Sequence, residues 1–221
     1  MEDVLEVYHR PYDPERPQVC IDETSKQLVE HTRAPIPAVP AVPARVEEGV
    51  AVPAIPGTLA RVDDEYKRCG TANIFAAIEP LTGKCILRAT EHRTAVDMAQ
   101  FLRHISDEVY PTAKTIVLVM DNLNIHGMHC LYEAFEPAEA RRLTERFEVH
   151  HTPKHGSWLD VAEIFLSILS RQSLDQRIGS IEQLKAILSA WGTQHADKKV
   201  NWRFTTADAR IKLHRLYPSL S

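Results

Sequence analysis

TIVLVMDN, residues 115–122, decides the fold class of this chain. The run up to Met120 is short, apolar and rich in β-branched side chains, which is typical of a strand buried on both faces of a sheet. Asp121 follows this run directly, and functional groups in α/β sheets gather at the carboxyl ends of strands. An ordinary Asp-Asn turn that ends a strand explains the same residues. Asp121 is therefore a candidate whose role depends on its neighbours.

The segments around this strand alternate between strand and helix patterns. The predicted hairpin has its turn at residues 81–83, because Gly83 lies between two apolar runs. The other elements follow from apolar spacing, with a proline in the first turn of one helix. The predicted strands are 18–23, 73–80, 84–90, 115–120 and 147–152, and the predicted helices are 94–109, 137–147, 158–174, 181–195 and 205–215. This order predicts an α/β fold, a mixed sheet covered by helices.

The composition is that of an ordinary globular protein. Of the 221 residues, 44% are hydrophobic and 25% are charged, and no apolar run reaches the roughly 18 residues that span a bilayer. The N-terminus is acidic and lacks the basic start and apolar core of a signal peptide. We therefore expect a cytoplasmic protein without a membrane segment. The four scattered cysteines form no CxxC pair and favour reduced thiols over a disulfide or zinc framework.

Charge and proline are unevenly distributed. The net charge is −4, but residues 141–221 carry 13 bases against 8 acids, which is compatible with a polyanion bound on one side. Residues 34–56 hold six of the 14 prolines. Since proline fixes φ and lacks an N–H donor, this stretch is expected to be an extended, polyproline-like surface loop or linker.

Two further acids stand where a scaffold would hold them. Asp22 ends a predicted strand and shares a face with Cys20, whereas Glu23 points the other way and fits a solvent-facing residue better. Glu163 belongs to a narrow polar stripe on an otherwise apolar helix, which faces either solvent or a cleft. Asp160 lies on the same stripe, but with Ser157 as N-cap it is explained by a capping box and the helix dipole.

Several segments, which follow one another in the family's order along the chain, together resemble the catalytic domain of DDE-type transposases of the Tc/mariner superfamily, in particular the bacterial insertion-sequence branch. The matching segments are VCIDETSKQL, EYKRCGTANIFAAIEPLTG, TIVLVMDNLNIHG, LYEAFEPAEARRL, HHTPKHGSWLDVAEIFLSILSRQ and WRFTTADARIKLHRLYP. They cover most of residues 18–218. The resemblance implies an RNase H-like fold with a five-stranded mixed sheet. It also implies that Asp22, Asp121 and Glu163 are the catalytic acids and the metal ligands.

The implied reaction is metal-dependent cleavage of DNA at transposon ends, followed by strand transfer into target DNA. Two Mg²⁺ or Mn²⁺ ions are implied, because oxygen ligands suit these cations and two ions can activate the attacking water and stabilise the leaving oxygen. The implied partners are transposon-end DNA, target DNA and a second copy of the chain on DNA. Alternatives from other classes are an inactive remnant or DNA-binding partner that keeps the fold, and a stand-alone RNase H-like nuclease.

Candidates for supporting or DNA contacts surround the three acids. A turn-forming role competes with phosphate or ligand contact for Asn122, Asn124 and His126. Lys154 and His155 lead into the Glu163 helix, and a lysine cation suits phosphate. Further along the same helix, Asp160 and Arg171 share its polar stripe. Trp158 is expected to be a core anchor, with base stacking as the alternative.

Three departures from the family pattern bear on these expectations. The stretch 34–56 is longer than the usual connection, which suggests an insertion. Asp160 stands where relatives commonly have Asn, so it adds a carboxylate. Residues 1–17 form only a short lead-in, too short for the helix-turn-helix domain of relatives, and a separate helix-turn-helix polypeptide or a frameshift partner is expected to supply that function.

Overall fold

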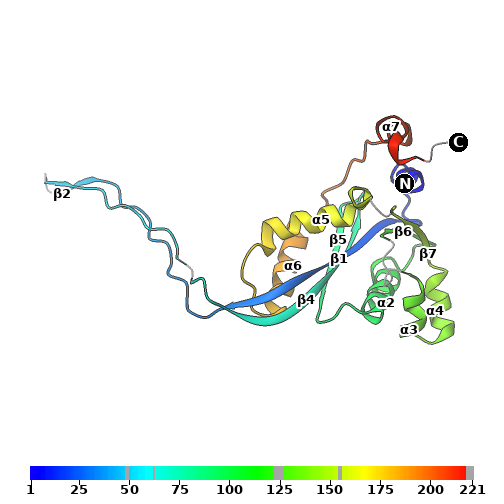
Figure 1. The fold of residues 1–221 in the computed structure, drawn as a ribbon, viewed down its shortest axis with the longest axis horizontal. Coiled ribbons are helices and arrows are strands. Elements are labelled where there is room, and N and C mark those ends of the chain that lie inside the picture. Colours follow the sequence, from blue (N-terminus) through cyan, green and yellow to red (C-terminus); the bar gives the residue numbers. More distant parts are fainter. Residues whose placement is uncertain (48–49, 62, 122–126, 154–155, 218–221) are drawn as a thin grey trace.

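The computed structural model describes residues 1–47, 50–61, 63–121, 127–153 and 156–217. Its centre is a five-stranded sheet in the order β5-β4-β1-β6-β7 (Figure 1). The strands are β1 (Gln18–His31), β4 (Tyr66–Glu79), β5 (Lys84–Thr90), β6 (Ile116–Met120) and β7 (Phe147–His151). β1, β4 and β5 pair antiparallel, whereas β1, β6 and β7 run parallel. The predicted α/β fold with a mixed five-stranded sheet is confirmed.

Successive side chains of each central strand point to opposite faces of the sheet, so both faces carry apolar side chains. Helices cover both of these faces. On β4, Ile74 and Ile78 belong to the core beneath α5 and α6, whereas Phe75 belongs to the core beneath α2, α3 and α4 (Figure 1). The α-helices are α1 (Glu2–Tyr8), α2 (Ala95–His104), α3 (His129–Ala134), α4 (Pro137–Thr144), α5 (Val161–Leu169), α6 (Ile181–His195) and α7 (Thr206–Lys212). The wider, π-helical turns are η1 (Ile105–Val109) and η4 (Ser170–Leu174), and the tighter, 3₁₀ turns are η3 (Ser157–Leu159) and η5 (His214–Leu216).

Several predicted elements differ in length from the observed ones. The helix predicted over 94–109 ends as an α-helix at His104 and continues as a π-turn, and the helix predicted over 158–174 is divided into η3, α5 and η4. The strand predicted over 18–23 extends to His31, because β1 pairs with β4 from Cys20 to His31 with one register shift between Gln27 and Val29. The hairpin turn is as predicted: Gly83 has φ 82°, and a Cβ there would lie 2.4 Å from the backbone nitrogen of Lys198.

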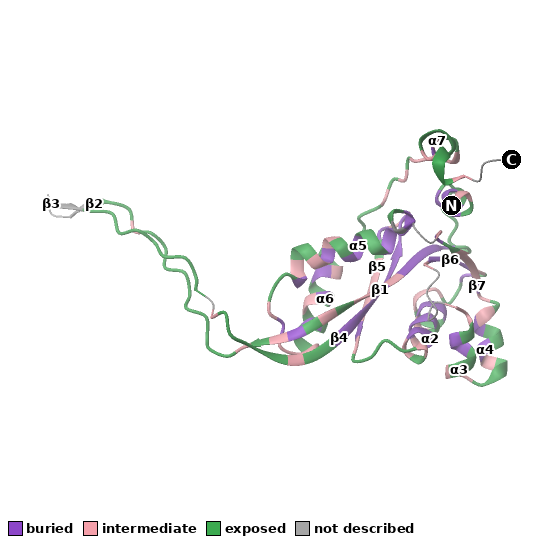
Figure 2. Ribbon diagram, in the orientation of Figure 1, coloured by how far each residue is buried: buried purple, intermediate pink, exposed green. Residues whose placement is uncertain are grey.

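The proline-rich stretch forms most of a two-stranded arm, residues 34–61 in their described part. The arm projects far from the sheet, and Figure 2 shows it exposed along most of its length. Its two segments pair through residues three apart, Ile36 with Arg61, Val39 with Thr58 and Val42 with Ile55, and each pair exchanges two backbone hydrogen bonds of 2.9 Å. The expected extended conformation is present, but the stretch is a paired ribbon and not a single loop.

This three-residue spacing explains how the arm accommodates proline. On the outgoing segment each paired residue is followed by a proline, at positions 37, 40 and 43, which need not donate a ladder hydrogen bond. The short strands β2 (Arg45–Glu47) and β3 (Val50–Val52) pair near the tip. Elsewhere, no helix among the described residues combines the length and apolar character that crossing a bilayer requires.

Candidate active site

Asp22 and Asp121 leave the sheet at the same place. β1 and β6 are parallel neighbours in a register that pairs Cys20 with Val119 and Ile21 with Met120. One step further, this register sets Asp22 beside Asp121. Cys20 and Val119 both lie in the core beneath α5, so the alternation of side chains directs the two aspartates to that same face. The sheet therefore presents two carboxylates, both partly exposed, to α5.

Glu163 completes this group from the opposite wall. It lies in the first turn of α5, is exposed, and lines a pocket of about 400 Å³ together with Asp22 and Asp121. Ser167 and Ser170, one and two turns further along, line the same pocket. The polar stripe of this helix thus faces a cleft, which was one of the two alternatives left open by the sequence. The three acids predicted as a set are brought together.

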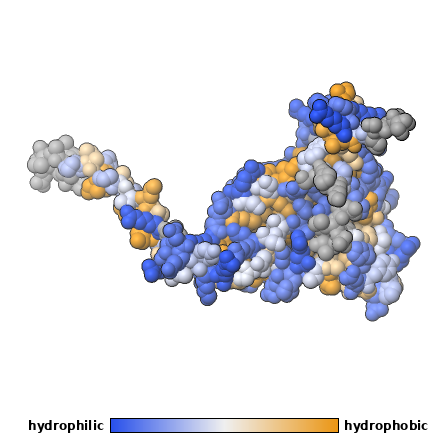
Figure 3. Space-filling model, in the orientation of Figure 1, coloured by the Kyte–Doolittle hydropathy of each residue, from blue (hydrophilic) through white to orange (hydrophobic). Residues whose placement is uncertain are grey.

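The helix that carries Glu163 is less buried than predicted. Ile164 is 43% exposed, although the sequence pattern placed it on a buried face. Figure 3 shows hydrophobic surface in the region of α5. The apolar residues of α5 that do enter the core are Val161, Ala162, Phe165, Leu166 and Leu169. They fix the rotation of the helix and so hold Glu163 toward the pocket.

Asp160 is the N-cap of α5. Its Oδ1 accepts a hydrogen bond of 2.8 Å from the backbone N–H of Ala162, and the residue is 1% exposed. The expected capping function is confirmed, but the expected N-cap, Ser157, is wrong. Ser157 begins the preceding η3 turn, and the α-helix starts only at Val161. Glu163 accordingly lies within the first turn and not beyond it.

A buried tyrosine anchors the backbone just before this cap. The hydroxyl of Tyr8, on α1, donates a 2.5 Å hydrogen bond to the carbonyl oxygen of Leu159, and its ring packs at 4.8 Å from that of Trp202. Sequence reasoning missed this contact, because the two hydrogen-bonded residues are 151 positions apart. The only available signal was the apolar spacing of residues 4, 5, 7 and 8, which indicates a buried helix but no partner.

Glu23 is a second correction. The sequence indicated a solvent-facing residue, whereas its side chain is 1% exposed and forms an ion pair of 3.1 Å with Arg93. Burial of a carboxylate becomes tolerable when a cation compensates it. Arg93 comes from the connection between β5 and α2, 70 positions along the chain, which local alternation could not reveal.

The remaining candidates have different outcomes. Arg171 is exposed, and its Nε donates to the backbone carbonyl of Ser167 at 3.3 Å, so it lies beside the pocket without lining it. Trp158 is 37% exposed rather than a core residue, with its ring stacked 6.4 Å from that of Trp202. The predicted contacts of Asn122, Asn124, His126, Lys154 and His155 lie outside the described residues.

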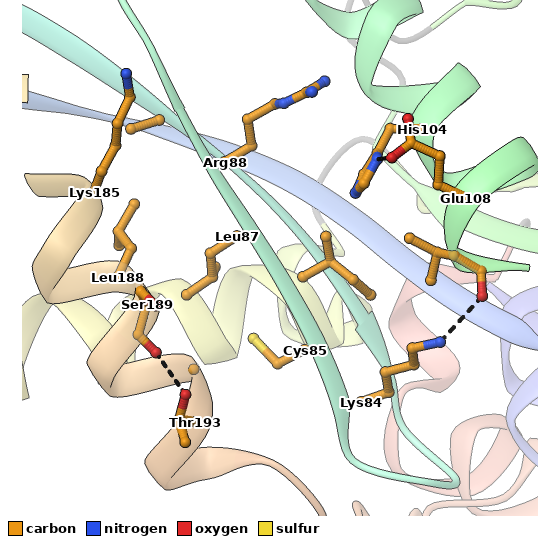
Figure 4. A pocket seen from close by; sticks show the side chains of 14 residues that line it. Lys84, Cys85, Leu87, Arg88, His104, Glu108, Lys185, Leu188, Ser189 and Thr193 are labelled. Atoms are coloured by element: carbon orange, nitrogen blue, oxygen red, sulfur yellow. Dashed lines mark hydrogen bonds and ion pairs between the residues drawn. The ribbon is translucent and has the colours of Figure 1, made fainter. Parts of the chain in front are cut away.

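A larger cavity of about 880 Å³ lies away from the three acids, along the edge strand β5 and between α6 and η1 (Figure 4). Its side chains are largely engaged with one another or with nearby backbone. Nζ of Lys84 donates to the carbonyl of Val109 at 3.2 Å, and His104 lies 3.1 Å from Glu108. Because no catalytic constellation converges there, the smaller pocket with the three acids is the candidate active site.

The family of the chain follows from comparison with known proteins. The family model of DDE superfamily endonucleases matches residues 48–185, which is 138 of the 221 residues and includes Asp121 and Glu163. The chain belongs to the DDE superfamily of endonucleases. Asp22 lies before the matched range, so its place in the site depends on the strand register and on the pocket that it lines with Asp121 and Glu163.

Structural comparison gives the same fold for this DDE endonuclease domain. A chain in the crystal structure of the Mos1 strand transfer complex matches with a TM-score of 0.55 and 16% sequence identity. The match covers 89% of the present chain and 53% of the other, so this DDE domain spans about half the length of that chain. A search of curated proteins found no match.

The three acids of the pocket suit a divalent cation by their chemistry. Carboxylate oxygens are the preferred ligands of Mg²⁺ and Mn²⁺, and Oδ2 of Asp160 is a buried oxygen without a hydrogen-bond partner among the described residues. Within those residues, however, no three acidic, histidine or cysteine side chains already converge closely enough to hold one ion. The residue types fit a metal, and ion binding requires the side chains to draw together.

Proposed function

We propose that this chain is the catalytic domain of a Tc/mariner-type transposase, which cleaves DNA at transposon ends and joins the ends to target DNA. The observation that supports this function most strongly is the convergence of three acids on one pocket. Asp22 and Asp121 are adjacent through strand register, and Glu163 faces them from α5. Family membership supplies the endonuclease chemistry, and the bacterial insertion-sequence branch is part of the proposal.

In this proposal the three acids hold the metal, as Mg²⁺ or Mn²⁺ and as two ions. Such ions, when bound, supply Lewis-acid activation of water and of the scissile phosphate. The two aspartates are fixed at the ends of adjacent strands and give the site a rigid wall. Glu163 is exposed on the facing helix and can adjust toward a ligand. This division of roles agrees with a site whose acids share a pocket but converge fully only on binding.

DNA is the proposed substrate and partner. The basic C-terminal third, with 13 bases against 8 acids over residues 141–221, supplies charge that a phosphate backbone attracts. A second copy of the chain and a helix-turn-helix polypeptide are proposed as further partners on transposon ends. The proposed localisation is cytoplasmic, on the bacterial nucleoid when bound to DNA. Analytical ultracentrifugation with transposon-end duplexes tests the assembly.

Nicking of supercoiled plasmid tests the catalytic proposal. The purified chain is expected to nick DNA with Mg²⁺ or Mn²⁺ and to be inactive in chelator. Asp121→Asn is expected to reduce nicking to the level without metal, because it removes a carboxylate charge from the site. Asp175→Asn, the same change at an exposed residue outside the pocket, is the matched control and is expected to retain full activity.

Two other functions give different results in these assays. A stand-alone nuclease would nick DNA but would not join a transposon-end duplex to plasmid, so absence of joined product with robust nicking would favour it. An inactive remnant would bind neither Mg²⁺ nor Mn²⁺ in calorimetry. The lack of three converged ligands among the described residues is the observation that favours the remnant.

A further inference from the structure

Asp160 is buried at the start of the helix that carries Glu163, and its two carboxyl oxygens have different surroundings. Oδ1 accepts the 2.8 Å hydrogen bond from Ala162 that caps α5. Among the described residues Oδ2 has no hydrogen-bond partner, although Asp160 is only 1% exposed. A buried polar atom left unsatisfied costs about 1–3 kcal/mol, and more if it is charged. Such an atom in a folded protein therefore requires an explanation.

Capping alone does not explain this residue. An N-cap needs one oxygen to accept from the first-turn amides, and Ser or Asn provide it as well as Asp without a charge. A buried carboxylate adds a desolvation cost that these neutral residues avoid. The cap thus accounts for Oδ1, and among the described residues it explains neither Oδ2 nor the presence of a carboxyl group at this position.

Among the described residues, the titratable side chains that interact with Asp160 are acidic or neutral. Burial, then the charge of Asp22 and to a smaller degree that of Asp121, raise the pKa of Asp160 to about 8 against the hydrogen bonds from the helix amides. Burial raises the pKa of the Tyr8 hydroxyl and of the Cys20 thiol, and the negative charge of Asp160 adds to this effect. Both groups therefore stay protonated at neutral pH. Among the described residues Asp160 has no ion pair with a cation. Asp160 is thus a carboxyl group beside the negative charges of Asp22 and Asp121, a setting that a divalent cation would stabilise.

We propose that Oδ2 of Asp160 is a fourth carboxylate ligand of the divalent-metal site that Asp22, Asp121 and Glu163 form. This inference rests on the proposed function, because it adds a ligand to the same metal site. The cap holds Asp160 in place before the ion arrives, so one oxygen is already positioned while exposed Glu163 closes from the helix. Asp160 would then bind metal with one oxygen and hold the start of the Glu163 helix with the other.

Two variants separate ligation from capping. Asp160→Asn keeps a capping oxygen and a weak neutral ligand, whereas Asp160→Ser keeps a capping oxygen and removes any atom that reaches the ion. Titration of Mn²⁺ into the full chain without DNA, by calorimetry and by the Mn²⁺ electron paramagnetic resonance signal, measures affinity. We expect the affinity to fall by about 10-fold or more, with Ser weaker than Asn. Equal affinity in the wild type and both variants would overturn the inference.

Control measurements make the outcomes separable. Glu23→Gln removes a carboxylate that lines the same pocket but is already paired with Arg93, and it is expected to bind Mn²⁺ nearly as the wild type does. A loss as large as that of Asp160→Asn would assign the effect to general charge and overturn the inference. If Asp121→Asn loses binding while the Asp160 variants do not, the proposed function stands and the fourth ligand fails. If the wild type binds no Mn²⁺, both fail. Metal-free thermal unfolding of each variant verifies its fold.

Discussion

Removal of one hydroxyl, in Tyr8→Phe, is expected to loosen the backbone that positions the active-site helix. Tyr8 is buried, and its hydroxyl donates a 2.5 Å hydrogen bond to the carbonyl of Leu159, which directly precedes the N-cap Asp160. The hydroxyl also lies 3.4 Å from Sγ of Cys20. The variant keeps the ring and its packing against Trp202, so the change removes only the contacts of the hydroxyl, with Leu159 and with Cys20.

The expected loss is about 1–3 kcal/mol of the free energy of unfolding, because the Leu159 carbonyl is left buried without its donor. Urea unfolding would show a lower midpoint with an unchanged slope. For a chain of this size the melting temperature falls by roughly 2–4 °C per kcal/mol. Amide hydrogen exchange in the first turn of α5 is expected to accelerate as well.

The matched control is Tyr12→Phe, which makes the same chemical change at a residue that is 54% exposed. A surface substitution of this kind usually stays within about 0.5 kcal/mol. If Tyr8→Phe cost no more than Tyr12→Phe, the hydrogen bond would not anchor η3, and the argument for its support of α5 would be refuted.

Two further substitutions test the sheet and its edge. Burial raises the pKa of Glu148, but the hydrogen bonds from Arg10, His150 and Arg16 together outweigh burial and lower the pKa from 4.5 to about 2. The resulting stabilisation, about 1–3 kcal/mol after solvent screening, is complete above about pH 5 and lost as the pH falls toward 2. The stability difference between the wild type and Glu148→Gln should shrink over that range, and a constant difference would contradict the argument. Leu118→Ala, in the fully buried β6, should lower the free energy of unfolding measured in urea by about 2–5 kcal/mol. The control Leu59→Ala, at an 88% exposed position, should lower it little. Equal losses of stability in the two variants would refute the assigned burial.

Strong apolar patterns made much of the sheet predictable. The run at 115–120 is β6 with a one-residue difference, and the segment at 84–90 is β5 as predicted. The second half of β1 escaped prediction because residues 24–27 are polar and their strand conformation comes from pairing with β4. The arm escaped prediction because its hydrogen bonds recur every third residue, a spacing that strand alternation does not contain.

The candidate site was predictable where strand and helix phase determine direction. Strand alternation predicted that Asp22 shares a face with Cys20, and the helical stripe limited Glu163 to solvent or a cleft. The structure decides for the cleft and sets Asp121 on the face of Asp22. Local pattern failed where distant residues decide the environment. Arg93, 70 positions away along the chain, makes the burial of Glu23 possible. The η3 turn delays the start of the α-helix to Val161, so Asp160 is the N-cap, the position that the sequence assigned to Ser157.

The central claim is that Asp22, Asp121 and Glu163 form one metal-dependent site that cuts DNA. The most direct measurement is the initial rate of plasmid nicking by the wild-type chain and by Asp121→Asn, each with Mg²⁺ and with chelator. The account predicts nicking only by the wild type and only with the metal. Nicking that persists in chelator, or that Asp121→Asn performs at the wild-type rate, would contradict it.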